Sequence, residues 1–340
     1  HKITVNGMKE GSKLVGTLMV TSGTDGHIEI KGGTYENPKY CPIYINGSVS
    51  TDSSTLSVKN ATITASGTDS DQDAGCAVYL AGYCTSTFTN TTITAPVTGI
   101  EIRAGKLTLK NCTVTGGNGT VTTSANGNGT TVKNAALAIS QHTTKKPIDV
   151  TITGGKYTAT AALFQTDVQG TGSADVNATV NSGTFNGTVS AETNNTVAVK
   201  GGKFTNAVPE NCCAAGFVPT QNTDGTYGVK VDTSVAEVNG TKYETLAEAI
   251  ASATRNATVT LLADTRENVT IDKAMTLDLK GHTLNGGTEK AKPALTITAR
   301  PVKIQDSSEA QTGTIMREDT AENSGVSSHY VIDIQGNAWV

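Results

Sequence analysis

The sequence predicts an all-β protein whose chain coils as a parallel β-helix, which is a type of solenoid. Three observations predict this class. One short sequence motif, which we call the phrase, recurs along the chain, and its copies are separated by about the length of one coil. The composition also contains too few apolar residues for a thick hydrophobic core. Only 36% of the 340 residues are hydrophobic, and 4% are aromatic. Short alternations of apolar and polar residues still run almost end to end, which is not the pattern of a disordered chain.

The repeated phrase is seen in STLSVKNATITAS, residues 54–66, and again in GKLTLKNCTVTGG, residues 105–117. In each copy two apolar residues alternate with polar ones, and an Asn or Gly, a small residue and a third apolar residue follow. The alternation predicts a strand with one buried face, and the Asn or Gly predicts a sharp bend because both tolerate positive φ. The copies end at Tyr35, Ile63, Ile93, Val114, Tyr157, Phe185 and Phe204.

The spacing of the copies indicates how the chain coils. Successive copies end 19 to 30 residues apart, except for a gap of 43 between Val114 and Tyr157, which predicts a degenerate copy hidden around GTTVKNAALAIS. Each repeat also carries a further strand before the next phrase, such as PIYIN or GIEIR, which makes three short strands per coil. Such repeats indicate a solenoid with consecutive coils about 4.8 Å apart. A β-sandwich of similar polarity is the alternative.

The chain divides into two units near residue 232. After Phe204 the phrase stops, and a turn-rich stretch predicts a cap that closes the first unit, residues 1–231. The second unit, residues 232–340, opens with a helix at about 245–254, where Thr245 and Glu248 stand at the spacing of a capping box. This helix is expected to cover the first strands of an incomplete second β-helix, in a chain that we expect to be an excerpt of a longer protein.

Two stretches resemble large, repetitive surface proteins of gut Firmicutes. One is AEVNGTKYETLAEAIASATRNATVTLLAD at the start of the second unit, and the other is NCCAAGF followed by DGTYGVK at the end of the first. The resemblance covers residues 195–310 well and the earlier repeats loosely. It implies a right-handed, pectate-lyase-like β-helix on an exported, wall-associated bacterial protein that binds mucosal host molecules, immunoglobulins included. It supplies no catalytic residues.

Alternation in the further strand of each repeat predicts which side chains face outwards. In three successive repeats the outward positions are Tyr44, Tyr79 and Glu101, which are expected to form one exposed row flanked by Tyr40, Tyr83 and Arg103. Tyrosine and arginine carry much of the binding energy at protein interfaces, and aromatic faces also suit sugars. This row is the candidate binding face, and the alternative is that outward tyrosines simply favour strands.

Cysteines and aspartates give two further candidates. Cys41 and Cys76 occupy the same position in neighbouring repeats, so a shared wall would bring their sulfur atoms to a spacing compatible with a disulfide. Two buried thiols are the alternative. Asp69, Asp71 and Asp73 superficially resemble a calcium-binding loop, but the glycine and the bidentate acid of such a loop are displaced, so a solvated loop tip is favoured over Ca²⁺.

The pattern of candidates favours binding over catalysis. No histidine stands at metal-ligand spacing with another His or Cys, and neither a nucleophile elbow nor a phosphate loop occurs. The leading prediction is a non-catalytic, extracellular scaffold without a cofactor that binds a host protein or a mucosal glycan. A polysaccharide lyase or glycoside hydrolase that uses Glu101 or the three aspartates is one alternative, and a ligand-free stalk is the other. The net charge of −4 argues against nucleic acid as the partner, and no segment is apolar enough to enter a membrane.

Overall fold

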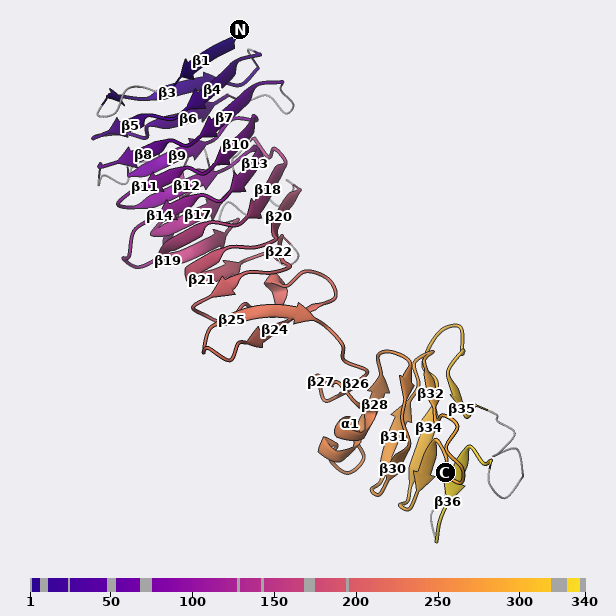
Figure 1. Ribbon diagram of the computed structural model, residues 1–340. Coiled ribbons are helices and arrows are strands. Elements are labelled where there is room, and N and C mark those ends of the chain that lie inside the picture. Colours follow the sequence, from indigo (N-terminus) through magenta and orange to yellow (C-terminus); the bar gives the residue numbers. More distant parts are fainter. Residues whose placement is uncertain are drawn as a thin grey trace. The chain divides into compact units, whose positions relative to one another are not determined.

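The structure is a computed structural model, which describes residues 2–6, 12–23, 25–47, 53–67, 75–126, 129–141, 144–167, 175–193, 196–318 and 329–336. The chain is 52% strand and 3% helix, and most strands lie in long parallel sheets (Figure 1), which is the all-β class that the repeats predict. The chain divides into two compact units, His1–Asp232 and Thr233–Val340. Within the described ranges no helix is long and apolar enough to cross a membrane.

The repeats of the first unit place their strands in three parallel rows, which the chain visits in the same order, and the last repeat contributes to the first two rows. The first row consists of β1 (Lys2–Asn6), β4 (His27–Lys31), β7 (Thr55–Lys59), β10 (Thr85–Thr89), β13 (Gly105–Lys110), β18 (Ile148–Thr153), β20 (Val176–Val180) and β22 (Val197–Val199). The second row consists of β2 (Lys13–Val15), β5 (Thr34–Asn37), β8 (Thr62–Ala65), β11 (Thr92–Thr94), β14 (Thr113–Thr115), β19 (Lys156–Gln165), β21 (Thr184–Ala191) and β23 (Lys203–Phe204). The third row consists of β3 (Leu18–Thr21), β6 (Ile43–Asn46), β9 (Cys76–Leu80), β12 (Thr98–Ile102) and β17 (Ala135–Ile139), and it continues into the second halves of β19 and β21.

Parallel pairing in register puts the apolar positions of the phrase directly over one another. In the first row Ile30 pairs with Val58, and Val58 pairs with Phe88. In the second row Tyr35 pairs with Ile63, and all five side chains are buried in one continuous core. Stacking of like positions therefore lets a chain with few aromatic residues build a core that is long and thin.

Asparagine makes the bend between the first and second rows. Asn60, Asn90 and Asn111 have φ values of 56°, 49° and 52°, in the left-handed region that asparagine tolerates better than most residues. The side-chain amide of Asn90 donates to Oδ1 of Asn60 in the preceding repeat at 3.4 Å. The backbone conformation thus explains why Asn recurs at this position of the phrase.

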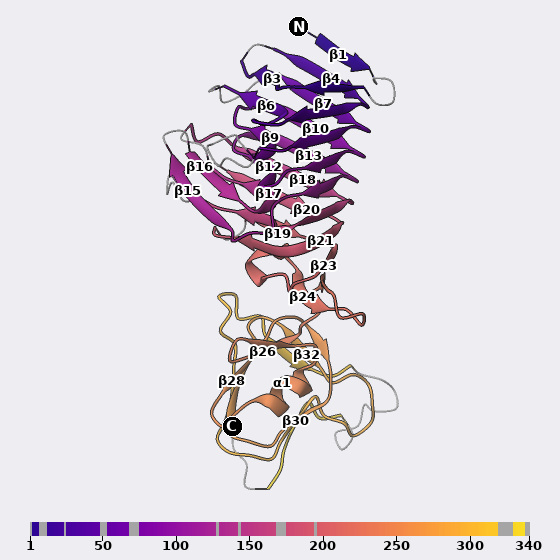
Figure 2. The same cartoon turned by 90° about the vertical axis from the view of Figure 1, so that its left-hand side faces the viewer.

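A hairpin, not a degenerate repeat, fills the wide gap between Val114 and Tyr157. The strands β15 (Thr122–Asn126) and β16 (Gly129–Lys133) pair in antiparallel fashion and lie beside the third row (Figure 2). The chain then re-enters that row at β17, where Ala135 pairs with Thr98. The expected hidden copy was wrong because the alternating residues of GTTVK form a hairpin strand outside the rows.

The first unit ends in a cap that reverses the chain direction. It consists of a 3₁₀ turn η1 (Glu210–Cys212) and the antiparallel strands β24 (Phe217–Gln221) and β25 (Tyr227–Val231). Tyr227 of β25 pairs in antiparallel fashion with Phe204 of β23. Phe204 also closes an internal aromatic ladder, in which the ring centroids of Tyr157, Phe185 and Phe204 follow one another at 4.8 Å.

The second unit contains three sheets around its own core. One sheet contains β26 (Ala236–Val238), β27 (Thr241–Tyr243), β28 (Thr258–Leu261), β31 (Met275–Asp278) and β34 (Val302–Gln305). The other two contain β29 (Thr265–Arg266), β32 (Thr283–Asn285) and β35 (Thr314–Met316), and β30 (Val269–Ile271), β33 (Leu295–Ile297) and β36 (Ile332–Ile334). Pairing is parallel except where β26 meets β27 and β28.

The helix α1 (Leu246–Ser252) packs on the first strands of the second unit through Leu246, Ala249 and Ile250. Thr245 is its N-cap, and its hydroxyl accepts a hydrogen bond from the amide of Glu248 at 3.1 Å. The carboxylate of Glu267 accepts from the amides of Leu246 (2.8 Å) and Ala247 (3.0 Å). Half of the expected capping box is therefore present, and a carboxylate from beyond the helix satisfies two further amides.

Candidate functional site

The third row brings the expected binding residues together in register. Tyr44 of β6 pairs with Tyr79 of β9, and Tyr79 pairs with Glu101 of β12. The rings of Tyr44 and Tyr79 are stacked with their centroids 5.2 Å apart. Arg103 directly follows β12 and lies against the Tyr79 ring, with its Cζ atom 5.0 Å from the centroid.

The expectation that this row is exposed is wrong. The relative exposure is 2% for Tyr79, 2% for Glu101 and 0% for Arg103. Tyr44 is partly buried. We call these four residues, with Cys41 and Cys76, the outer cluster. Of the flanking tyrosines, Tyr40 is 48% exposed and Tyr83 is partly buried.

The hairpin β15–β16 contributes to the burial of Glu101. Its Val132 is buried together with Ala135, Ala138 and Ala161, which point outwards from the third row. The carbonyl oxygen of Val132 accepts a hydrogen bond from Oγ1 of Thr98 at 2.6 Å, and its backbone also hydrogen-bonds Glu101. Alternation correctly separates the two faces of a strand, but it does not reveal that an insertion covers the outer face.

Glu101 and Arg103 form a buried ion pair. The Nε atom of Arg103 lies 3.1 Å from Oε1 of Glu101, and the hydroxyl of Ser140 donates to the same oxygen at 2.9 Å. Burial raises the pKa of Glu101, and the opposing effect of Arg103 does not cancel it. The Nη1 and Nη2 atoms of Arg103 are buried and have no hydrogen-bond partner among the described residues. A pair with such incomplete hydrogen bonding costs desolvation energy.

Ser140 is a member of this site that sequence reasoning missed. It follows β17 directly, and because Ile139 pairs with Ile102, it occupies the position of Arg103 in the next repeat. The signal was available in AALAIS, the segment that contains the third-row strand β17. Sequence reasoning assigned AALAI to a further strand of this kind, but it followed the outward positions only as far as Arg103.

Cys41 and Cys76 are both thiols in the structure, which is the alternative to the expected disulfide. They lie in one small buried cluster with Tyr79. Burial, and next the charge of Glu101, raises the pKa of Cys76 well above its ordinary value. Because the thiolate is the reactive form of cysteine, Cys76 is a weak nucleophile in the folded protein.

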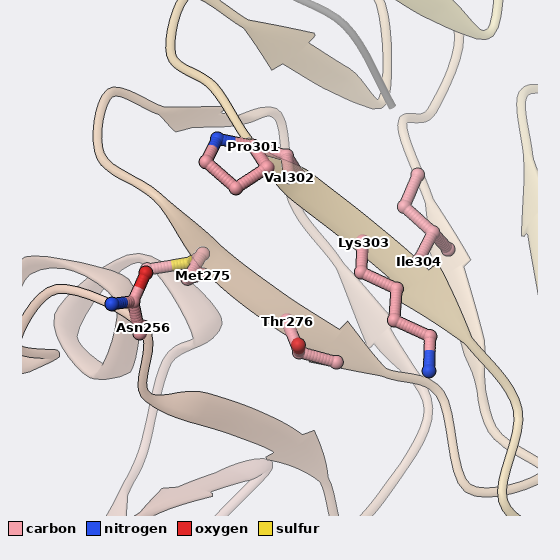
Figure 3. Close-up of a pocket in the computed structure, with 7 residues that line it drawn as sticks. All are labelled: Asn256, Met275, Thr276, Pro301, Val302, Lys303 and Ile304. Carbon is pink, nitrogen blue, oxygen red and sulfur yellow. The ribbon is translucent and has the colours of Figure 1, made fainter.

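The candidate calcium ligands Asp69, Asp71 and Asp73 lie outside the described residues. Among the residues that are described, no group of three or more His, Cys, Asp and Glu side chains is placed to hold a metal ion. The second unit carries a surface hollow of about 590 Å³, shown in Figure 3. Met275 and Val302 line it with the polar side chains of Asn256, Thr276 and Lys303, and Lys303 is the only ionisable residue in this lining.

The chemistry of the outer cluster is that of one carboxyl group beside one guanidinium group. A glycosidase needs two carboxyl groups across the scissile bond, and the acidic group described in this cluster is Glu101. Comparison of the chain with protein-family models, curated proteins and solved structures finds no match. The resemblance to surface proteins of gut Firmicutes therefore stays a prediction.

Proposed function

We propose that the rows of strands in each unit are the walls of a right-handed parallel β-helix, and that the chain is a non-catalytic, extracellular scaffold that binds a host protein or a mucosal glycan. The observation that carries the proposal is the parallel, in-register pairing along the rows of the first unit, with register shifts between β19 and β21. Thr62, Thr92 and Thr113 pair in succession, as do equivalent residues along the other rows. Such stacking gives a rigid body with long, regular outer faces, which suits a bacterial surface adhesin.

Ligand contact is assigned to the exposed faces, because the outer cluster lies beneath other side chains. Tyr40 is 48% exposed, and Tyr44 and Tyr83 are each partly exposed. Tyr79, Glu101 and Arg103 support the wall from beneath. An alanine at Tyr79 therefore tests stability, whereas an alanine at Tyr40 tests contact with a ligand.

The test is capture of a partner from mucosal secretions by the immobilised chain, with the heat-unfolded chain as control. We expect the folded chain to retain a host protein, immunoglobulin included, or a glycoprotein, which then binds the purified chain directly. Retention of nothing beyond the control would contradict the proposal and favour a ligand-free stalk.

A polysaccharide-active enzyme is the second candidate, with Glu101 as its acid because burial raises the pKa of this carboxyl group. The 2% exposure of Glu101 and its ion pair with Arg103 count against this role, since a general acid must reach the substrate. The chain is incubated with pectins, mucin and host glycans, and new reducing ends or unsaturated products are measured. Products that disappear in Glu101→Gln would support the enzyme, whereas absence of products would leave the binding proposal in place.

A further inference from the structure

Two columns of residues flank the bend between the first and second rows. One column holds the residue that closes the first-row segment of each repeat, and the other holds the residue that opens the second-row strand. Pairing aligns the first column through Lys31 and Lys59, and it aligns the second through Thr113 and Lys156. Neighbouring members of a column therefore lie about 4.8 Å apart along the unit.

Lysine is concentrated in these columns. The first contains Lys31, Lys59, Lys110 and Lys200, and the second contains Lys13, Lys156 and Lys203. No acidic residue and no aromatic residue occupies either column along the described strands. We call these lysines the lysine ridge. A positive ridge is notable in a chain whose net charge is −4, since random placement would mix both signs.

Stability does not explain the lysine ridge. Lys31 and Lys59 lie directly opposite each other in adjacent parallel strands, and like charges in this arrangement destabilise a sheet. Threonine occupies the same column at Thr89, so the fold accepts an uncharged residue there. A function that needs positive charge would explain why two lysines lie opposite each other at a position where threonine is also accepted.

Most of the lysine ridge is open to a ligand. Lys59, Lys110, Lys156 and Lys200 are exposed, and none of them forms an ion pair with another described residue. The other three are neutralised locally: Lys13 by Glu36 at 2.8 Å, Lys31 by Glu29 at 3.2 Å and Lys203 by Asp224 at 2.6 Å. Because the screening length is about 8 Å at physiological salt, charges in nearby repeats reinforce one another.

Polar side chains that suit a sugar lie along the same line. Asn60, Asn90 and Asn111 stand at the bend, and Thr62, Thr92 and Thr113 open the next strands; all six are exposed. Amides and hydroxyls donate and accept hydrogen bonds, so they match the hydroxyl groups of a saccharide. Binding of single-stranded nucleic acid relies on aromatic side chains that stack with bases, and neither column contains one.

We propose that the lysine ridge binds a linear anionic polysaccharide, sulfated or carboxylated, whose chain follows the stacking direction of the repeats. The proposal rests on the proposed binding function and names its ligand class. Charge complementarity carries it: the four unpaired lysines follow one another at intervals of one or two repeats along the two columns, and they match the anions of one extended chain. The bound polymer would release counterions, so its affinity falls as the salt concentration rises.

The test compares two charge-matched variants of the whole chain. The ridge variant carries K59Q, K110Q, K156Q and K200Q, and the control variant carries K39Q, K106Q, K280Q and K303Q at exposed sites away from the columns. Binding of dextran sulfate, polygalacturonate, neutral dextran and single-stranded DNA is measured by calorimetry at several salt concentrations. Melting temperature is recorded for each protein.

We expect the parent chain to bind an anionic polysaccharide and not neutral dextran. The ridge variant should lose about tenfold or more in affinity, with a smaller salt dependence, while the control stays within about twofold of the parent. The melting temperature of the ridge variant should stay close to that of the parent, because the four substituted lysines are exposed and form no ion pair with a described residue. Equal loss in both variants, absence of binding in the parent, or tighter binding of DNA through the ridge would overturn the inference. Capture of a host protein by the ridge variant would then still support the proposed function.

Discussion

At the scale of single residues, the buried pair of Glu101 and Arg103 is the least expected feature of the first unit. Such a pair stabilises a fold only when its hydrogen bonds are complete, and here no residue that the structure describes accepts a hydrogen bond from the two buried Nη atoms of Arg103. Ser140 and the backbone of Val132 supply the remaining contacts of Glu101. The pair therefore ties β12 to β17 and to the hairpin at an energetic cost.

Removing one member of the pair should be worse than removing both. Glu101→Ala leaves a buried guanidinium without its counterion, and we expect it to lower the free energy of unfolding by about 3–5 kcal/mol. The double variant Glu101→Leu with Arg103→Met should be within about 1 kcal/mol of the parent or more stable. Urea unfolding followed by circular dichroism measures both. A double variant that is less stable than Glu101→Ala would contradict this account.

The carboxyl group of Asp306 should make the stability of the second unit depend on pH in the acidic range. Partial burial would raise its pKa, but hydrogen bonds from the amides of Gly313, Ser308 and Gly281 outweigh this effect and lower the pKa to about 2. A pKa that is lower in the folded state gives stability above the ordinary value of 3.8, and this stability is lost as the pH falls through the folded value.

We expect Asp306→Asn to be less stable than the parent at pH 6. The difference between the two proteins should shrink as the pH falls from about 4 to about 2, because the parent then loses the charge that the variant lacks. Urea midpoints at several pH values measure it. A difference that stays constant over that range would show that the carboxylate charge is not the stabilising factor.

At the scale of elements, α1 depends on caps from two places in the chain. Thr245→Ala removes the hydroxyl that accepts from Glu248, and a lost N-cap typically costs about 1 kcal/mol. We expect Glu267→Ala to cost at least as much, since its carboxylate accepts from two helix amides. Glu248→Ala is the matched control and should have a smaller effect. Thermal unfolding of the three variants orders them, and an effect of Glu248→Ala equal to that of Glu267→Ala would contradict the order.

The sequence pattern predicts strands that pair with equivalent strands of neighbouring repeats. It does not predict the position of an element that occurs once and pairs outside the repeats. The period-2 phrase identified the strands that contain Val58 and Leu109, because successive strands of the first row repeat the same alternation. The Thr245 cap could also be predicted, since it is local. The position of the hairpin over Ala138 could not, because β15 and β16 pair with each other and lie outside the repeat. This one element reversed the expected exposure of Glu101.

At the scale of the whole molecule, each repeat of the first unit pairs mainly with its neighbours. Stability in such an array is close to a sum of repeat and nearest-neighbour contributions. Phe185 lies between Tyr157 and Phe204 in the aromatic ladder. A cavity at Phe185 should therefore loosen nearby repeats more than distant ones.

We expect Phe185→Ala to cost about 3–5 kcal/mol and to reduce hydrogen-exchange protection most in β19, β21 and β23. Phe88→Ala is the matched control, because Phe88 is also fully buried but lies in the repeat of β10. Its loss of protection should centre on β7 and β13, with which β10 pairs. Equal loss along the entire unit in both variants would contradict nearest-neighbour stability.

The hairpin β15–β16 marks a corner where the chain tolerates additional length. The chain leaves after β14, forms two antiparallel strands and returns at β17, with Ala135 opposite Thr98 and Ala161 opposite Ala135. Pairing on either side of the excursion continues without a shift between these residues. Peptides grafted at this corner would thus be displayed on the side of the protein while the interior stays unaltered, which makes the corner a natural point for protein engineering.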